Sequence, residues 1–209
     1  MEQQQEQLKH GLEEKEENLS SVQADKIVFQ LHNKYIVSPV RSGLLFIDQQ
    51  RAHERILYEV FSKAIENNKG ASQQELFPKT LQLSTADFEL MKAVLNEVKA
   101  VGFDISEFGK NTFVIHGIPA DLSDHDGTEL LESLIEQYRQ NLSELKVNKR
   151  DNIARSLAKR SAIKNGRQLG QAEMKNLINA LFACEVPNFA PDGRRVATIL
   201  SAEKIEELF

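Results

Sequence analysis

A short apolar run that leads directly into a long helical pattern constrains this chain most. Residues 43–47 are apolar throughout, as in a strand that is buried on both faces. Asp48 follows, and a helix is predicted over residues 50–67. The apolar residues of that helix recur at helical spacing: Ile56, Leu57, Val60, Phe61 and Ala64. A buried strand joined to an amphipathic helix needs a sheet with helices packed on it.

The rest of the chain alternates between strand patterns and helix patterns. Residues 27–37 place Ile27, Phe29 and Leu31 at every second position, which is typical of a half-buried strand. Further strands are predicted at 81–83, 103–108, 112–117 and 196–200, and helices at 84–102, 127–142, 149–165, 171–183 and from Ser201 onward. The expected fold class is α+β, a small sheet with packed helices.

The composition is that of an ordinary globular protein. With 209 residues, 41% of them hydrophobic, the chain suits one large domain or two small lobes with a shared core. Its one cysteine, Cys184, excludes an intrachain disulfide and indicates the reducing cytoplasm, and at the end of an apolar helix it is expected to be buried. No apolar run approaches the roughly 20 residues of a membrane span. Residues 1–23 are polar and charged, which is typical of a disordered linker remnant.

The charge is unevenly distributed along the chain. A net charge of -5 argues against a protein that coats DNA uniformly. Residues 146–175, however, hold nine basic residues against the two acidic residues Asp151 and Glu173. Weak, salt-sensitive contact with DNA is predicted for this stretch. The candidate side chains are Arg155, Lys159, Arg160, Lys164 and Arg167.

The junction between the apolar strand and its helix allows two interpretations. A carboxylate at a strand end, beside a helix that carries His53 and Glu54, is a pattern that can hold a metal ion. In the other interpretation Asp48 caps the helix, while His53, Glu54, Arg55 and Glu59 form a solvated face. Residue types alone favour the second interpretation.

A second distinctive segment is Gln74-Glu75-Leu76-Phe77-Pro78. A glutamine followed by two adjacent large apolar residues is typical of short peptides that dock in apolar pockets of a partner. In the alternative, this is a loop whose Leu76 and Phe77 pack on their own domain. The local sequence alone favours the alternative.

The order of these motifs resembles the C-terminal domains of bacterial MutL proteins of DNA mismatch repair. Residues 46–59 (FIDQQRAHERILYE) resemble the DQHAxxExxxxE signature of that family. Residues 103–119 (FDISEFGKNTFVIHGIP) look like its lobe strands. Residues 158–164 (AKRSAIK) stand where the family has an ACR motif, and residues 190–195 (APDGRR) where it has CPHGRP. The resemblance covers about residues 24–209.

The resemblance implies a two-lobed fold and a tethering function. A dimerisation lobe would comprise residues 24–73 and 153–209, with an outer α/β lobe, residues 74–152, inserted between them. The implied function is homodimerisation, which tethers the family's N-terminal ATPase domains and contacts downstream repair factors. ATP and magnesium belong to that N-terminal domain, which lies outside this sequence, so no cofactor is expected here.

The resemblance also implies a set of partners. Besides a second copy of the chain, these are the replication sliding clamp, a MutS-type mismatch recognition protein, a downstream nuclease or helicase and, weakly, DNA, but no membrane. A clamp-binding peptide occurs at the corresponding lobe junction of the family, so Gln74, Leu76, Phe77 and Pro78 are expected to contact the clamp. The expected location is cytoplasmic and nucleoid-associated.

Departures from the family pattern bear on nuclease activity. Gln50 and Arg51 replace the histidine and alanine of DQHA, although Asp48, Gln49, Glu54 and Glu59 of this degenerate motif are retained. The remaining replacements are Lys159, Ala190 and Asp192 in place of cysteine, cysteine and histidine. A zinc site needs thiolate or imidazole donors, so this domain is expected to lack the family's nuclease. The alternative is a DNA-nicking endonuclease that uses surviving carboxylates, with Asp48, Glu54 and Asp192 as weak metal candidates.

Overall fold

The computed structural model describes residues 27–144 and 148–209, so the expected linker at residues 1–23 lies outside it. The chain divides into two compact units, Met1–Arg55 with Ile163–Phe209 (unit 1) and Ile56–Ala162 (unit 2). The expected lobe boundaries lay after residue 73 and before residue 153. The units instead change at Arg55, inside a helix, and after Ala162. Among the described residues, no helix has the length and apolar character needed to cross a membrane.

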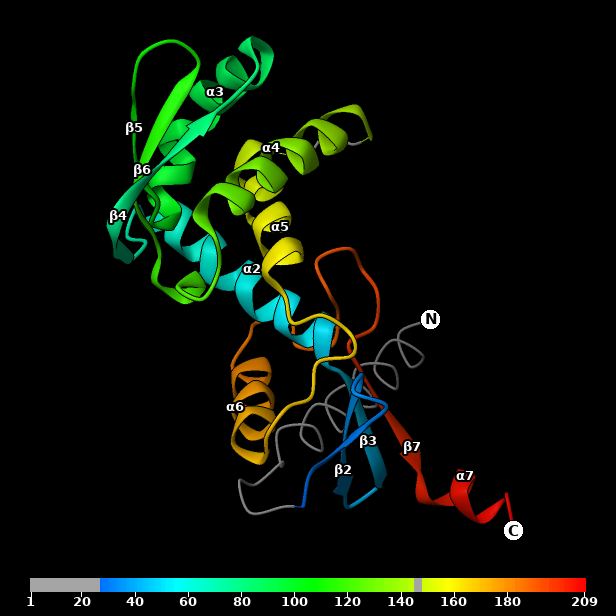
Figure 1. Ribbon diagram of the computed structural model, residues 1–209. Coiled ribbons are helices and arrows are strands. Elements are labelled where there is room, and N and C mark those ends of the chain that lie inside the picture. The colour runs from blue at the N-terminus through cyan, green and yellow to red at the C-terminus, as the bar shows by residue number, and fades with distance from the viewer. Residues whose placement is uncertain (1–26, 145–147) are drawn as a thin grey trace. The chain divides into compact units, whose positions relative to one another are not determined.

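Unit 1 contains a four-stranded antiparallel sheet (Figure 1). Its order is β1 (Phe29–Leu31), β2 (Tyr35–Val40), β3 (Gly43–Asp48) and β7 (Ala197–Ser201). Helix α6 (Gln171–Phe182) belongs to the same unit, and β7 leads directly into the short helix α7 (Ala202–Glu206). The prediction of one strand over residues 27–37 is wrong, because His32 and Asn33 adopt positive φ angles and turn the chain into a hairpin.

The two faces of this sheet differ in what covers them. Residues paired across neighbouring strands point to the same face, so the pairing assigns each side chain to a face. One face is buried and apolar: Ile36, Leu45, Ile47 and Ala197. The opposite face, called here the open sheet face, buries Val37 at its centre but carries other apolar side chains that remain partly or largely exposed: Phe29, Leu31, Leu44, Phe46 and Leu200.

The apolar alternation at the start of the chain points outward. Phe29 is 46% exposed and Leu31 38%, and Ile27 is more exposed still. The expected half-buried strand therefore exists only in part, because its apolar side chains lie on the open sheet face and not in the core of unit 1. The alternation correctly indicated a strand, but it could not tell which face the rest of the chain would cover.

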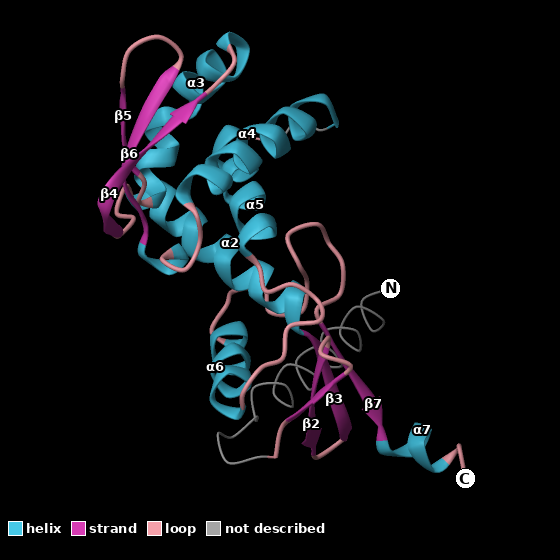
Figure 2. Cartoon of the chain, viewed as in Figure 1, coloured by secondary structure: helices cyan, strands magenta, loops and turns pink. Residues whose placement is uncertain are grey.

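Unit 2 is built on a three-stranded antiparallel sheet with helices (Figure 2). The strands are β4 (Ser72–Gln82), β6 (Thr112–Pro119) and β5 (Asp104–Glu107), in that order. The helices are the second part of α2 (Gln49–Asn67), then α3 (Thr85–Val101), the short turn η1 (Ala120–Leu122), α4 (Gly127–Glu144) and α5 (Lys149–Ser161). Side chains from all three strands and from α2, α3, α4 and α5 form its apolar core.

The helices of unit 2 begin and end where local chemistry requires. Ser84 accepts a hydrogen bond from the backbone N–H of Asp87 and so caps α3, and Gly102 ends that helix at φ 121°. Strand β4 is much longer than the predicted strand at 81–83, because it also includes the segment from Gln74 to Pro78. The mixture of helices and small antiparallel sheets confirms the α+β class.

Candidate functional site

Asp48 ends strand β3 and begins helix α2. Its buried carboxylate accepts a hydrogen bond from the backbone N–H of Arg51, with 3.0 Å between Oδ1 and N. This contact satisfies one of the N–H groups that the first turn of a helix leaves without a partner. The predicted capping role of Asp48 is therefore confirmed.

The Arg51 guanidinium connects Asp48 to the loop before β7. Its Nε lies 3.5 Å from Asp48 Oδ2, and its Nη1 donates to the backbone carbonyl of Arg195 at 3.0 Å. A carboxylate and a carbonyl oxygen are the kinds of acceptor that a hard divalent cation takes. In this chain a guanidinium, which is permanently charged, contacts both of them.

The same loop holds a second pair of carboxylate and guanidinium. Arg194 donates twice to Asp192, from its backbone N–H at 3.0 Å and from Nε at 2.5 Å, and Gly193 turns the chain at φ 84°. Partial burial raises the pKa of Asp192, but the hydrogen bonds from Arg194 and the charges of Arg194 and Arg51 outweigh burial, and the pKa is lowered. Asp192 is thus an ionised carboxylate that is already paired with arginine.

The next turn of α2 buries charged side chains that were expected in solvent. Glu54 is 4% exposed, and Arg55, also buried, donates from Nε to the backbone carbonyl of Phe189 at 2.6 Å. His53 Nδ1 accepts a hydrogen bond from the backbone N–H of Ile163 at 3.0 Å. The prediction of a solvated face is wrong here, because the loops at Ile163 and Phe189 contact this part of the helix.

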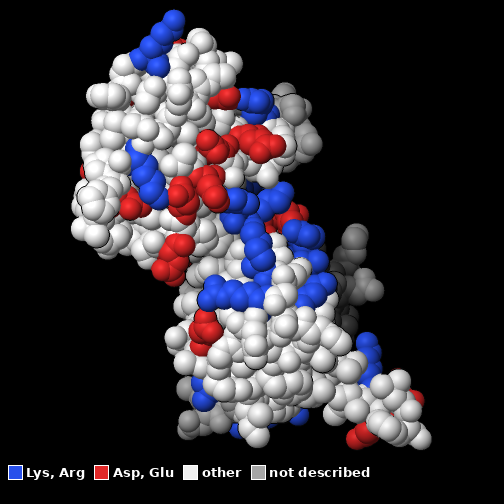
Figure 3. Space-filling view, viewed as in Figure 1, with Lys and Arg blue, Asp and Glu red and all other residues white. Residues whose placement is uncertain are grey.

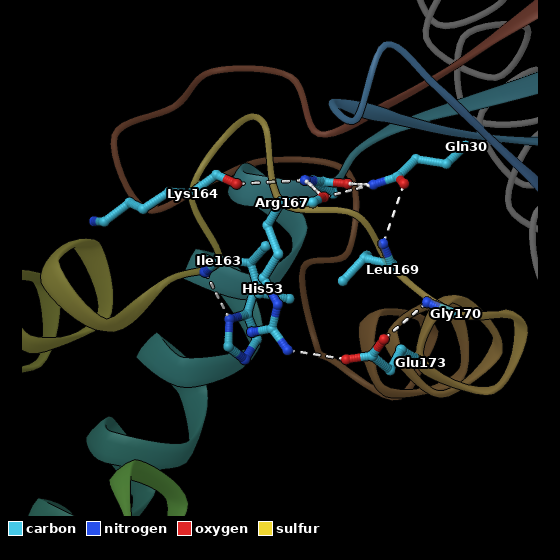
Figure 4. Close-up of polar contacts among 9 residues, drawn as sticks. Gln30, His53, Ile163, Lys164, Arg167, Leu169, Gly170 and Glu173 are labelled. Atoms are coloured by element: carbon cyan, nitrogen blue, oxygen red, sulfur yellow. Dashed lines mark hydrogen bonds and ion pairs between the residues drawn. The ribbon is translucent and has the colours of Figure 1, made fainter. Parts of the chain in front are cut away.

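Gln49 fixes the loop at residues 163–169 to the first hairpin. Its buried side chain donates to the carbonyls of Asn33 at 2.9 Å and Arg167 at 3.1 Å, and its Oε1 accepts from Gln30 Nε2 at 2.5 Å. Gln30 donates further to the Arg167 carbonyl at 2.8 Å and accepts from the backbone N–H of Leu169 at 3.1 Å (Figure 4). Two glutamine amides therefore bind the backbone of one loop.

The segment from Gln74 to Pro78 leaves the sheet of unit 2. Gln74 pairs with Gly117 of β6, and the pairing resumes only at Lys79 opposite Ile115. Between these two pairs the chain bulges, leaving Leu76 91% and Phe77 82% exposed. The alternative in which Leu76 and Phe77 pack on their own domain is therefore wrong.

Comparison with known proteins identifies the family of this fold. Residues 28–169 match the family model described as the MutL C-terminal dimerisation domain. The chain belongs to that family. It is similar to the DNA mismatch repair protein MutL of Prosthecochloris aestuarii, with 38% identity over 89% of the chain and 30% of that protein. Identity to the MutL of Chloroherpeton thalassium is 40% over 88% of the chain and 29% of that protein.

The MutL of Chlorobium limicola shows a similar relation, with 38% identity over 87% of the chain and 29% of that protein. The chain thus spans about three tenths of the length of these curated relatives. The match confirms the resemblance on which the expected fold and dimerisation rested.

The residues at the MutL metal positions do not fit a zinc ion. Ala190 offers no donor atom, Asp192 is paired with Arg194, and Asp48 is contacted by the Arg51 guanidinium. Within the described ranges, no three His, Cys, Asp or Glu side chains are placed to share a metal ion. Glu59, from the segment 46–59, and Lys159, from the segment 158–164, both lie in unit 2, where Glu59 Oε2 is 3.9 Å from Lys63 Nζ.

Several of the proposed DNA-contact side chains of this MutL domain are already engaged in ion pairs. Arg155 contacts Asp151 at 2.7 Å, Arg160 contacts Glu129 at 3.5 Å, and Arg167 contacts Glu173 at 2.9 Å. Figure 3 likewise shows basic side chains next to acidic ones on the visible face. These pairs lower the positive charge available to a phosphate backbone, so contact with DNA stays a prediction.

Sequence reasoning missed the structural residues around the MutL motif. Gln30 and His53 contact the backbone of residues 163–169 from positions more than a hundred residues away. The only local signal was polar Gln49 between a buried strand and the first turn of its helix. Cys184, expected to be buried, is only partly buried, and its thiol donates to the Ala180 carbonyl at 3.4 Å.

Proposed function

We propose that this chain joins two copies of a longer MutL-type protein and thereby tethers their ATPase domains. The open sheet face supports this proposal, because it gathers Phe29, Leu31, Leu44, Phe46 and Leu200 on one side of a sheet. Contiguous exposed apolar side chains of this kind mark interaction surfaces. Joined C-terminal domains make the pairing of N-terminal domains intramolecular, which raises their effective concentration.

A second copy of the chain is the proposed occupant of this face. Two such faces related by a twofold axis would bury like against like, as an isologous interface does. A stable dimer is expected to bury at least about 1,000 Å² in total. That area is within reach of two four-stranded sheets stacked face to face.

Sedimentation equilibrium of the purified chain tests this proposal. The wild type is expected to be a dimer at micromolar concentration, and Phe29→Asp with Leu31→Asp a folded monomer, because two charges would be buried without partners. Leu76→Asp with Phe77→Asp is the matched control, since this exposed apolar pair lies in unit 2, and it should remain a dimer. A monomeric wild type, or a dimer that tolerates both aspartates, contradicts the proposal.

We further propose that the chain does not nick DNA through the Asp48 site. The contact of Arg51 with Asp48 supports this, because a fixed positive charge repels a divalent cation from the carboxylate. The test combines a zinc measurement with a nicking assay on supercoiled DNA, with manganese and loaded clamp. Stoichiometric zinc would contradict this proposal, and nicking that disappears in both Asp48→Asn and Glu54→Gln would support the alternative of a carboxylate-based endonuclease.

A second function is favoured by the bulge in β4. We propose that Gln74, Leu76, Phe77 and Pro78 dock on the replication sliding clamp. The support is the exposure of Leu76 and Phe77, which an apolar pocket would cover. Replacing Gln74, Leu76 and Phe77 with alanine should abolish binding to purified clamp and leave the dimer intact. Unchanged clamp binding by this variant would refute the assignment.

The remaining contacts belong to the same proposal but have no assigned surface. A MutS-type mismatch recognition protein and a downstream nuclease or helicase would bind the tethered dimer. Weak DNA contact would come from the basic residues between 146 and 175. The proposed location is the bacterial cytoplasm, on the nucleoid.

A further inference from the structure

The bulge in β4 is fixed at its first end by a contact that crosses the whole sheet of unit 2. Gln74 of β4 and Asp104 of β5 both pair with Gly117 of the central strand β6. Gln74 Nε2 donates to Asp104 Oδ2 at 3.2 Å. A Cβ atom at position 117 would lie 3.2 Å from Gln74 Nε2 and 2.5 Å from Ser72 Oγ. Glycine there leaves the space through which the amide reaches the far strand.

The second end of the bulge is fixed by an ion pair. Lys79 Nζ lies 2.7 Å from Asp126 Oδ2. The other oxygen of Asp126 accepts hydrogen bonds from the backbone N–H groups of Thr128 at 2.8 Å and Glu129 at 3.2 Å, in the first turn of α4. The hydrogen bond from Lys79 lowers the pKa of Asp126, so this carboxylate is ionised at neutral pH. It is held by the helix and in turn holds Lys79.

The residues between these two ends form the bulged part of β4. Residues 75–78 of β4 face only His116 of β6, so the chain must project from the sheet. Pro78 has a fixed φ angle and restricts the backbone of Phe77 before it. Leu76 and Phe77 therefore extend from a segment whose ends and whose backbone are both restrained.

We propose that Asp104 and Asp126 are positioning residues that hold residues 74–79 in the shape that docks on a partner. The inference rests on the clamp docking proposed above. A peptide that is ordered before binding loses less conformational entropy when it binds. The two carboxylates act through Gln74 and Lys79 and need not touch the partner. The partner's chemistry is an apolar pocket for Leu76 and Phe77, with a polar subsite that donates to the Gln74 side-chain oxygen, because Gln74 Nε2 is bound to Asp104.

The test is the affinity of the full chain for purified bacterial sliding clamp. Asp104→Ala removes the first restraint. Asp126→Asn removes the ion pair but keeps the helix cap, since asparagine caps as well as aspartate. Each is expected to weaken binding about twofold to fivefold, the range that an exposed polar pair supports. Glu107→Ala on β5 and Asp124→Asn before α4 lose the same charge nearby and should bind like the wild type.

A linear peptide of residues 72–80 supplies the second comparison, because it contains neither carboxylate. It should bind more weakly than the folded chain, and the Asp104→Ala, Asp126→Asn double variant should approach its affinity. The thermal midpoint of that variant should stay close to that of the wild type, which separates positioning from loss of fold. Wild-type or tighter binding by the double variant overturns the inference.

The failure of clamp docking itself has a different signature. In that case neither the chain nor the peptide binds the clamp. Hydrogen exchange at the amides of residues 75–77 then decides the positioning role alone. Faster exchange in the double variant than in Glu107→Ala would support the positioning role of Asp104 and Asp126. Equal exchange in the two variants would overturn it.

Discussion

Asp48 and Arg51 show how a buried carboxylate is compensated by a side chain of the helix that it caps. A buried carboxylate needs a compensating charge or several hydrogen-bond donors, because burial disfavours its ionised form. Asp48 receives a backbone N–H and the Arg51 guanidinium, both from the first turn of the helix that it caps. The family pattern has alanine where Arg51 stands. In this chain the positive charge that compensates the Asp48 carboxylate comes from the Arg51 side chain.

Replacing Arg51 with alanine should therefore destabilise unit 1. The variant leaves Asp48 without its guanidinium partner and the Arg195 carbonyl without its donor. The expected loss is about 1–2 kcal/mol in the free energy of unfolding, because the pair is partly exposed. Urea denaturation followed by circular dichroism measures it. Arg194→Ala, which removes an exposed pair inside the loop, should cost less than about 0.5 kcal/mol. Equal losses for the two variants would contradict this interpretation of Arg51.

Gln49 leads to a second prediction for a single residue. Its amide donates to the carbonyls of Asn33 and Arg167, and Gln49→Ala would leave these acceptors without that donor and open a small cavity. The expected cost is about 2–3 kcal/mol. The neighbouring Gln50→Ala lies on the half-buried side of the same turn and should be nearly neutral. The same urea series compares the two, and an equal effect of both variants would argue against the role given to Gln49.

At the level of elements, periodicity predicted helices well and strand faces poorly. Helix α3 was predicted at 84–102 and spans Thr85–Val101, because its apolar spacing and its Ser84 cap are local signals. The hairpin at His32 and Asn33 contains no glycine or proline that would mark its turn. The helix predicted to run to residue 165 ends at Ser161. Shortly beyond that end, the backbone N–H of Ile163 is bound by His53, a contact between distant residues that no local pattern reveals.

The contacts of the candidate site were also predictable only in part. The cap at Asp48 was predictable, because a carboxylate before a helix is a local signal. The contacts of Arg51 with Arg195 and of Arg55 with Phe189 join residues more than 130 positions apart, and only the fold brings them together. The burial of Glu54, which is 4% exposed, was equally invisible in the sequence.

The connection between α2 and β4 supplies a prediction for elements. Gly70 passes so close to the end of α3 that an added Cβ would lie 2.2 Å from the carbonyl carbon of Val101. Because backbone and not a flexible side chain stands there, Gly70→Ala should cost about 2–4 kcal/mol. Gly170→Ala, where the nearest atom is Glu173 Oε2 at 3.5 Å, leaves room for the Cβ and should cost less, about 0.5–1 kcal/mol, because alanine is a poorer N-cap of α6 than glycine. Thermal unfolding of both variants compares their stabilities. An unchanged stability of Gly70→Ala would show that the end of α3 can shift to accommodate the added Cβ at little cost.

At the level of the whole molecule, the net charge of -5 opposes the local excess of basic residues. The isolated chain is expected to bind duplex DNA weakly, with an affinity that falls steeply as salt rises. The double variant Lys159→Gln, Lys164→Gln should reduce the slope of log affinity against log salt by about 2, one unit for each lost phosphate contact. Fluorescence anisotropy over a salt series measures the slope. Lys92→Gln with Lys204→Gln serves as the control, and equal slopes in the two double variants would exclude a specific role for residues 159 and 164.

Unit 1 is made of two segments that are far apart in the sequence, so they leave the ribosome at different times. Unit 2 is continuous, so its core can close as soon as Ala162 has emerged. Strand β3 must wait much longer for its second neighbour, because Ile47 pairs with Ala197, which is 150 positions further along. During that interval β3 has an open edge of apolar residues, the kind of edge that recruits other nascent chains. Synthesis of residues 163–197 is therefore the interval in which β3 is most open to pairing with another chain.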